Sequence, residues 1–291
     1  MTRPQRPRVT VVGDVGLDVC CRLRAPIAAG DDTPAHITSH PGGAGANTAA
    51  RLARLGVEVE LIARIGDDEA GRAAAVELAS QGVDCRFAVD PTLPTGRVIV
   101  MVDAAGGRTM VSDRGANAAL RPEDVVLPPR PGHLHLSGYV LLDDRSRAAG
   151  RAALGTAFRA GWTTSVDPQT AAGIAAVGAA NFLDWVRGID LLLPNEAELA
   201  ALGGPDAALA AAGAVAVTHG RGGASWYAAG DPQRVPVDRV TDTDSTGAGD
   251  AFDAGFLAAW LGGESPAVAL AAGVRAGTEA AGAAGARDSP A

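Results

Sequence analysis

Short apolar runs that alternate with helix-like segments constrain the fold of this chain most strongly. Most runs are rich in Val, Leu or Ile and have the length of a buried strand. They cover residues 9–12, 59–63, 133–136, 163–166, 189–193 and 214–218. Helical spacing marks 47–55, 71–81 and 144–160; Asn47 is a candidate cap of the first, and Gly56 and Gly82 are stop signals. The alternation predicts a mostly parallel sheet with helices on both faces.

Two regions interrupt this alternation. Residues 35–39 alternate polar and apolar side chains, as a half-exposed strand does. Residues 97–102 and 108–112 flank Ala104-Ala105-Gly106-Gly107, which suits a hairpin loop. We predict a small antiparallel sheet beside the main domain, and a mobile cover over a cleft is its obvious use.

Polar residues gather where several predicted strands end. Asp14, Asp167, Asn195 and His219 each follow an apolar run closely. In open α/β sheets, ligands bind at the carboxyl ends of the strands. The sequence therefore predicts a binding site at that edge.

A glycine-rich segment near the C-terminus reads DSTGAGD at residues 244–250. Phe252, Phe256 and Trp260 follow with helical spacing, so the glycines open a helix whose N-terminal amides form an anion site. Asp250 stands at the same point. A plain helix cap and a plain turn are the alternatives. No Gly-Lys-Ser/Thr follows, so the segment is not a P-loop.

Composition excludes other classes of function. The net charge of −8 and the pI near 5.1 argue against a nucleic-acid or anionic-membrane surface. We find no apolar run long enough to span a bilayer. Cys20, Cys21 and Cys85 lack metal-ligand spacing and are odd in number, which fits reduced thiols. We expect a cytoplasmic protein with no nucleic-acid or membrane partner.

The motifs together resemble the ribokinase-like, or PfkB, family of carbohydrate kinases. One signature is PGGAGANTA at residues 41–49, and the other is the segment at 244–250. Further motifs occur in the family's order: Gly13 with Asp18, Gly96-Arg97, GANAAL at 115–120, Ser137-Gly138-Tyr139, Asn195 with Glu198, and Thr218 with Gly220. The similarity runs over nearly the whole chain.

The resemblance implies one ribokinase-like kinase domain over residues 1–291. Its fold would be a three-layer α/β/α arrangement with a mostly parallel central sheet. The strands of a small β-sheet lid would be inserted at about residues 20–40 and 96–114. The implied reaction moves the γ-phosphoryl group of ATP to a hydroxyl group of a small sugar, with Mg²⁺ as cofactor. Relatives also often bind a monovalent cation such as K⁺, through carbonyls near Asp244.

The family motifs assign roles residue by residue. Asp250 resembles the catalytic base, and the amides of Gly247, Ala248 and Gly249 resemble the anion hole. The implied sugar contacts are Asp18, Gly42, Gly43 and Asn47. Asn195 and Glu198 resemble the pair that organises Mg²⁺ and phosphate through water, while Thr218, Gly220 and Gly223 resemble the nucleotide wall. Positioning and charge neutralisation are what phosphoryl transfer requires.

This chain departs from ribokinases around the sugar. Gly16 and Ala44 replace the usual Asn and Lys, and residues 137–141 lack the expected Glu. Gln169 and Gly273 stand where relatives often have Asn. These changes leave the acceptor open between a sugar and a nucleoside, as in an adenosine kinase. A catalytically silent sensor on the same fold is the alternative from another class.

Simpler structural roles compete with several of these assignments. Asn47, Asn195 and Glu198 suit helix caps, and Asp167-Pro168 suits a strand-ending turn. We expect His219 to be structural. We also expect Arg97, Arg108 and Arg114 to form a solvated face of the lid. Exposed strand edges in that lid favour a homodimer.

Overall fold

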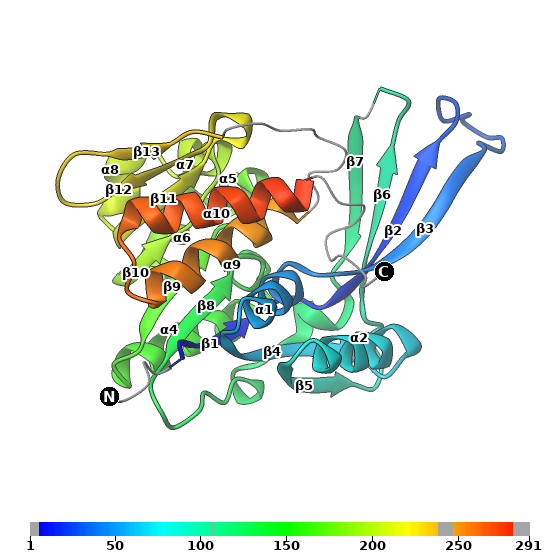
Figure 1. Cartoon of the computed structure of the whole chain (residues 1–291). Helices are drawn as coiled ribbons and strands as arrows, with labels where there is room; N and C mark the ends of the chain where they lie inside the picture. Colours follow the sequence, from blue (N-terminus) through cyan, green and yellow to red (C-terminus); the bar gives the residue numbers. More distant parts are fainter. Residues whose placement is uncertain (1–5, 106, 238–246, 282–291) are drawn as a thin grey trace.

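The computed structural model describes residues 6–105, 107–237 and 247–281. Its central sheet has the order β13-β12-β11-β10-β9-β8-β1-β4-β5, and the strands from β11 to β5 run parallel (Figure 1). The strands are β1 (Arg8–Val12), β4 (Glu58–Gly66), β5 (Val83–Asp90), β8 (His133–Ser137), β9 (Thr163–Asp167), β10 (Ile189–Leu192), β11 (Ala212–Thr218), β12 (Ala224–Tyr227) and β13 (Gln233–Val235). β12 and β13 add antiparallel pairings at one edge.

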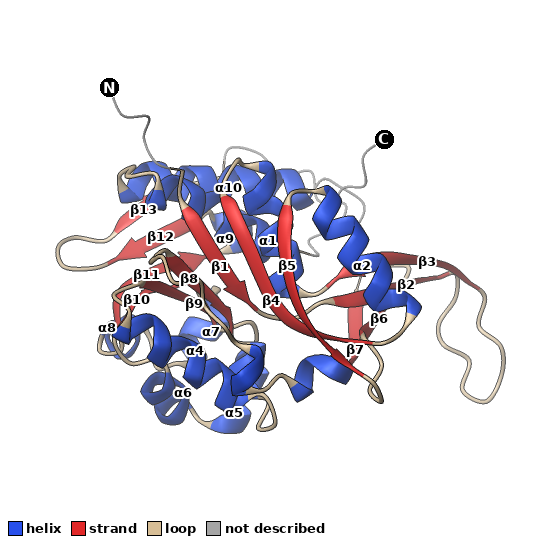
Figure 2. Ribbon diagram, turned by 90° about the horizontal axis from the view of Figure 1, so that it is seen from below, coloured by secondary structure: helices blue, strands red, loops and turns tan. Residues whose placement is uncertain are grey.

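Helices cover both faces of this sheet (Figure 2). On one face lie α1 (Ala44–Arg54), α2 (Glu69–Ser80), α9 (Ala248–Leu261) and α10 (Pro266–Ala281). On the other lie α3 (Tyr139–Leu142), α4 (Arg147–Arg159), α5 (Ala171–Val177), α6 (Ala179–Trp185), α7 (Glu196–Ala201) and α8 (Pro205–Leu209). Alternate strand residues feed the two layers: Val11 packs toward α1 and α9, and Val12 toward α4. The predicted three-layer α/β fold is confirmed.

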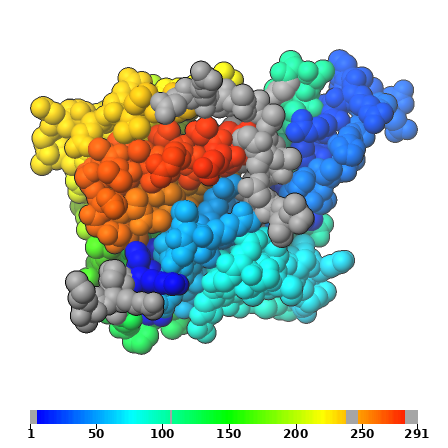
Figure 3. All heavy atoms as spheres, viewed as in Figure 1, coloured from blue at the N-terminus to red at the C-terminus, as the bar shows by residue number. Residues whose placement is uncertain are grey.

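A smaller sheet projects from the body (Figures 1 and 3). Its order is β3-β2-β6-β7, from β2 (Gly16–Leu23), β3 (Ala35–Gly42), β6 (Gly96–Val102) and β7 (Arg108–Asp113). The β6/β7 hairpin is antiparallel, as predicted, and the β2/β3 pair is antiparallel too. The prediction of an antiparallel sheet is wrong for the β2/β6 pair, which joins the two hairpins in parallel.

Several helix boundaries differ from the sequence-based prediction. The expectation that α1 begins at Asn47 is wrong: it begins at Ala44, and Gly43 is its N-cap with a φ of 97°. That backbone conformation suits glycine, and a Cβ at Gly43 would meet the Asp14 carbonyl at 2.5 Å. α2 begins at Glu69 because Asp68 caps it, accepting from the Gly71 amide at 2.9 Å.

None of the helices in the described part of the chain combines the length and the apolar character that a bilayer crossing requires.

Candidate active site

A cleft of about 340 Å³ lies between the carboxyl edge of the central sheet and the base of the small sheet. Asp14, Asp167 and Thr218 reach it from strand ends, and Gly16 and Val98 reach it from the small sheet. Of the residues singled out from the sequence, it brings together Asp18, Gly43, Asn47, Asn195, Glu198, Thr218, Gly247, Gly249 and Asp250. Segments from both halves of the chain therefore build one cavity.

A second pocket of about 430 Å³ adjoins this cleft. Asn195, Thr218 and Gly249 line both cavities. Further into the second pocket lie Gly220, Gly223 and Ala248, together with Val274, Gly277 and Thr278 of α10. Gly273 does not line it, because its backbone packs against the Phe252 ring, where a Cβ would meet the ring at 2.8 Å.

Asp250 lies in the first turn of α9. Gly247, with a φ of 73°, is the N-cap of this helix, and the first amides of a helix have no partner within it. The Asn47 side chain donates to Oδ2 of Asp250 at 2.8 Å, so α1 and α9 meet at this carboxylate. Among the described atoms, Oδ1 of Asn47 is buried and has no hydrogen-bond partner. The helix start thus combines a positive dipole end, a carboxylate and an amide that orients it.

Asn195 and Glu198 form a capping box at the start of α7. The Asn195 amide and side chain donate to the Glu198 carboxylate at 2.9 and 2.7 Å, and the Glu198 amide donates back at 2.9 Å. Burial raises the pKa of Glu198, and the two bonds from Asn195 oppose that rise. The pair is therefore both a helix cap and part of the cleft wall.

Two buried carboxylates accompany Asp250, Asp167 at the end of β9 and Asp253 on α9. Burial raises the pKa of both groups well above the ordinary value, and the neighbouring carboxylates raise them further. The hydrogen bond between them raises the pKa of Asp253 and lowers that of Asp167. Burial and the neighbouring carboxylates therefore favour the protonated form in this pair.

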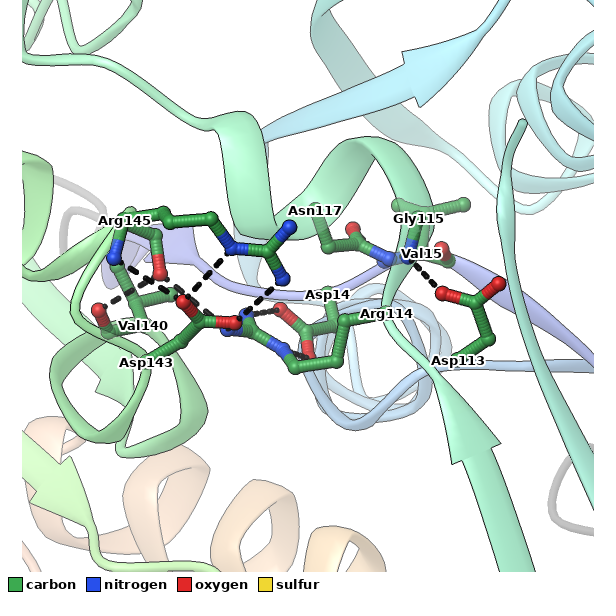
Figure 4. Close-up of polar contacts among 10 residues, drawn as sticks. Asp14, Val15, Asp113, Arg114, Gly115, Asn117, Val140, Asp143 and Arg145 are labelled. Carbon is green, nitrogen blue, oxygen red and sulfur yellow. Dashed lines mark hydrogen bonds and ion pairs between the residues drawn. The ribbon is translucent and has the colours of Figure 1, made fainter. Parts of the chain in front are cut away.

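The expectation of a solvated arginine face is wrong for Arg114, whereas Arg97 and Arg108 are exposed. The Arg114 side chain is largely buried beside the cleft (Figure 4). It pairs with Asp14 at 2.7 Å and with Asp143 at 3.1 Å, and it donates to Ser146 at 3.2 Å. Burial acts to lower the pKa of Arg114, but the carboxylates outweigh it and leave the pKa raised. Arg114 is therefore a fixed counter-ion for the cleft residue Asp14.

The root of the small sheet is anchored by Asn117. Its side chain accepts from the Val15 amide at 2.9 Å and donates to the Val15 carbonyl at 2.8 Å (Figure 4). β2 begins one residue later, and Asp18 on β2 lines the cleft. Gly42 faces the Asp18 carboxylate across the β2/β3 pair, and a Cβ there would overlap it. Gly42 thus makes room for the Asp18 side chain instead of lining the cavity itself.

Comparison with known proteins identifies the family. The model of the pfkB family carbohydrate kinases matches residues 7–291. The chain belongs to this family. A fructokinase of Klebsiella pneumoniae is 32% identical over 268 residues, which cover 86% of this chain and 83% of the relative. An ATP-dependent ribose-1-phosphate kinase of Halopiger xanaduensis is 33% identical over 289 residues, which cover 97% and 95%.

A solved structure of the same fold agrees with this assignment. The crystal structure of a proposed ribokinase II of Escherichia coli in complex with ATP and Mg²⁺ has a TM-score of 0.83 and 25% identity to this chain. The superposed region covers 96% of this chain and 94% of the other chain. The protein is an enzyme of the carbohydrate kinase class.

Sequence reasoning missed the roles of three groups that shape the site of this carbohydrate kinase: Asp253, Arg114 and Asn117. Asp167 differs from them, because its place at a strand end already predicts a position at the binding edge. Asp253 lies three residues after Asp250, on the same helix face, which was a usable signal. Asn117 lies in the GANAAL motif and Arg114 directly precedes it, but the local sequence does not reveal their partners, because Val15 and Asp14 lie about a hundred residues away.

Proposed function

We propose that this enzyme transfers the γ-phosphoryl group of ATP to a hydroxyl group of a small sugar. One observation carries the proposal: the amide-rich start of α9 borders both cavities, and Asp250, oriented by Asn47, lies at that boundary. The cleft would hold the sugar, and the second pocket would hold the nucleotide. A phosphoryl group at the junction would face the amides of Gly247, Ala248 and Gly249.

Asp250 would act as general base. It would accept the proton of the attacking hydroxyl as the new oxygen–phosphorus bond forms and the bond to the bridging oxygen of ATP breaks. Asp18, Gly43 and Asn47 would hold the sugar, with Gly42 giving Asp18 its place. Thr218, Gly220 and Gly223 would form the nucleotide wall.

The residues present fit a hydrated Mg²⁺ ion. Both oxygens of Glu198 already accept from Asn195, so a direct bond would compete with these contacts, whereas a metal-bound water needs only a remaining lone pair. Within the described ranges, no group of three or more His, Cys, Asp or Glu side chains is arranged to hold a metal. Mg²⁺ commonly relies on phosphates, waters and one or two carboxylates. When bound, it would neutralise charge on the transferred phosphoryl group.

A nucleoside is the second candidate acceptor. Val98, Val100 and Met110 give the cleft an apolar wall on the small sheet, which a nucleobase could contact. The polar side chains of Asp14, Asp18 and Asn117 favour a sugar. The two relatives described above are named for the sugars on which they act, which are fructose and ribose 1-phosphate.

A coupled ADP-release assay with fructose, ribose, ribose 1-phosphate and adenosine tests the proposal. It should be run with ATP and Mg²⁺, with and without K⁺, because carbonyl sites for a monovalent cation would involve residue 244, which lies outside the described residues. Turnover of a sugar supports the proposal. Turnover of adenosine alone would transfer the assignment to a nucleoside kinase. Tight binding of a sugar by calorimetry without any turnover would indicate a silent sensor.

The protein is also proposed to be a cytoplasmic homodimer. Its three cysteines are half-buried thiols, which supports a reducing compartment. β3 and β7 are the edges of the small sheet. Ile37, Ile99 and Val111 lie exposed on this sheet, on the face opposite to the cleft-lining Val98 and Ser112. An exposed apolar face with open edges favours contact with a second copy.

A further inference from the structure

A line of polar side chains runs through the core beneath α9. His133 and His135 on β8 pair in register with Thr163 and Ser165 on β9, so these four side chains share one sheet face. Both histidines are 1% exposed, and Ser165 is fully buried. We call these four residues the polar stripe. Its upper end reaches the level of Asp167, and its lower end, Thr163, is exposed at the opposite edge of the sheet.

Hydrogen bonds connect the polar stripe from end to end. Nδ1 of His135 and Nε2 of His133 contact the same atom, Oγ of Ser165, at 2.8 and 2.7 Å. Nδ1 of His133 contacts Oγ1 of Thr163 at 2.9 Å. Burial lowers the pKa of His135 to about 4 and that of His133 to about 3, so both rings are neutral. Each ring then has one donor and one acceptor nitrogen.

Because both rings are neutral, the series of hydrogen bonds in the polar stripe has a direction. The Ser165 hydroxyl carries one hydrogen, so it donates to one imidazole and accepts from the other. Either every donor points toward Thr163 or every donor points toward the cleft. Passing one proton along the chain exchanges these two arrangements without creating a lasting buried charge.

Asp253 lies between the polar stripe and the active-site carboxylates. Its side chain is 3% exposed, and its Oδ2 atom is buried without a hydrogen-bond partner among the described atoms. Nε2 of His135 lies 3.9 Å from this Oδ2 atom. A small rotation of the carboxyl group would close this gap to hydrogen-bond distance. The same carboxyl group hydrogen-bonds to Asp167 and lies one helical turn from Asp250.

We propose that Asp253 and the polar stripe form a proton relay, which carries the acceptor proton from Asp250 to the opposite edge of the sheet. The proposal rests on the proposed kinase function. Asp253 and the stripe residues are positioning and transfer groups, and they do not touch the reacting atoms.

The reaction releases one proton, and the relay gives that proton a route while substrates fill the cleft. The acceptor hydroxyl loses its proton to Asp250, its oxygen bonds to the γ-phosphorus, and ADP leaves with the electron pair of the broken bond. One proton must then return to water. With substrates filling the cleft, the exit runs from Asp250 to Asp253, then through His135, Ser165 and His133 to Thr163 and solvent. Each group gives up one proton as it accepts another, so no net charge remains in the core. The hydrogen bonds then point the other way, and the rings and hydroxyl groups must reorient before the next turnover.

Ser165→Ala tests the relay because it removes the one atom that joins the two histidines. A stopped-flow experiment with a sugar accepted in the screen would follow ADP formation and, with a pH indicator dye, proton release in the first turnover. In the parent enzyme the two signals should coincide. In the variant, proton release should lag behind ADP formation by about tenfold or more, while ADP formation changes less than about twofold.

Matched variants separate this effect from altered packing. Ser165→Thr keeps the hydroxyl and should restore coincident signals. Thr164→Val removes a buried hydroxyl on the other face of the same strand, where Thr164 bonds Asp190, and should also leave them coincident. If Ser165→Ala does not fold, His133→Gln breaks the chain at its next link and should show the same lag. Coincident signals in a folded variant would overturn the relay alone. Failure of the parent enzyme to form ADP with any acceptor would overturn the proposed function as well.

Discussion

Asp250 and Asn47 show how single residues define this site. Asp250 is a favourable residue for a first helical turn, so its position alone does not distinguish a base from a cap. Its carboxylate faces a cavity, and the side chain of Asn47 from another helix holds it at 2.8 Å. A cap serves its own backbone, whereas this carboxylate is oriented from outside its helix.

Replacing the carboxylate tests the proposed base directly. Asp250→Asn keeps size and polarity but cannot accept a proton, and we expect kcat to fall by at least about a hundredfold. ATP affinity measured by calorimetry should remain, because the nucleotide pocket is lined by other residues. Asp206→Asn on α8 is the matched control and should behave like the parent enzyme. An Asp250→Asn enzyme with full turnover would disprove the assignment.

At the scale of elements, the pairing of β8 with β9 is costly unless its polar groups bond one another. His133 and His135 lie in the middle of the sheet, where burial disfavours a charged imidazole. Their bonds to Thr163 and Ser165 satisfy these rings while they are neutral. Stability should therefore depend on keeping them neutral.

His133 should weaken the fold in acid. Its pKa is about 3 in the folded protein and near 6.5 when unfolded, so between these two pH values only the unfolded chain takes up the proton, and stability falls as the pH falls. Between about pH 6 and 4, this histidine lowers the free energy of unfolding by about 1.4 kcal/mol per pH unit. Urea unfolding across this range should show a correspondingly shallower pH dependence for His133→Gln. Parallel curves for the two proteins would contradict the shift.

The small sheet depends on one side chain at its root. Asn117 satisfies both the amide and the carbonyl of Val15, immediately before β2. Asn117→Ala leaves two buried backbone groups unpaired and should cost about 2–4 kcal/mol of unfolding free energy. Amide exchange should rise first in β2. Thr92→Ala is the control, because it also removes a side-chain hydrogen bond but lies in a partly exposed loop. It should lower the free energy of unfolding far less. Equal losses in the two variants would argue against an anchoring role.

At the scale of the whole molecule, a three-layer body carries a projecting sheet (Figure 3). The body supplies the strand ends and the α9 start, and the projecting sheet supplies Asp18 and the apolar wall. One face of that sheet lines the cleft, whereas Ile99 and Val111 on the other face are exposed.

The exposed face predicts self-association. In light scattering at micromolar concentration, the parent protein should have the mass of a dimer. Val111→Asp places a charge on the apolar face and should shift the mass toward the monomer. Val76→Asp changes an exposed valine on α2, outside the small sheet; it is the matched control and should not change the mass. A parent protein that is monomeric under these conditions would end the dimer proposal.

Local sequence determined much of this protein. The apolar runs and the glycine stops predicted the layered fold, because strand and helix periods depend on near neighbours. The segment at 244–250 predicted an anion site, because glycines and a helix start act through their own backbone. β5, β12 and β13 escaped prediction. β5 is largely half-exposed, and β12 and β13 are short, so their apolar signal is weak.

Tertiary structure decided which polar residues meet. Asn47 reaches Asp250 across 203 residues, and Arg114 is buried only because packing brings Asp14 and Asp143 to it. Burial likewise determines the protonation of Asp253 on α9 and of the two histidines of the polar stripe beneath that helix. The charge state of a side chain depends on the solvent and the charges around it, and folding sets both. The sequence therefore named the chemistry of the site, and the packing of its layers decided which groups are neutral, which are paired and which face the cleft.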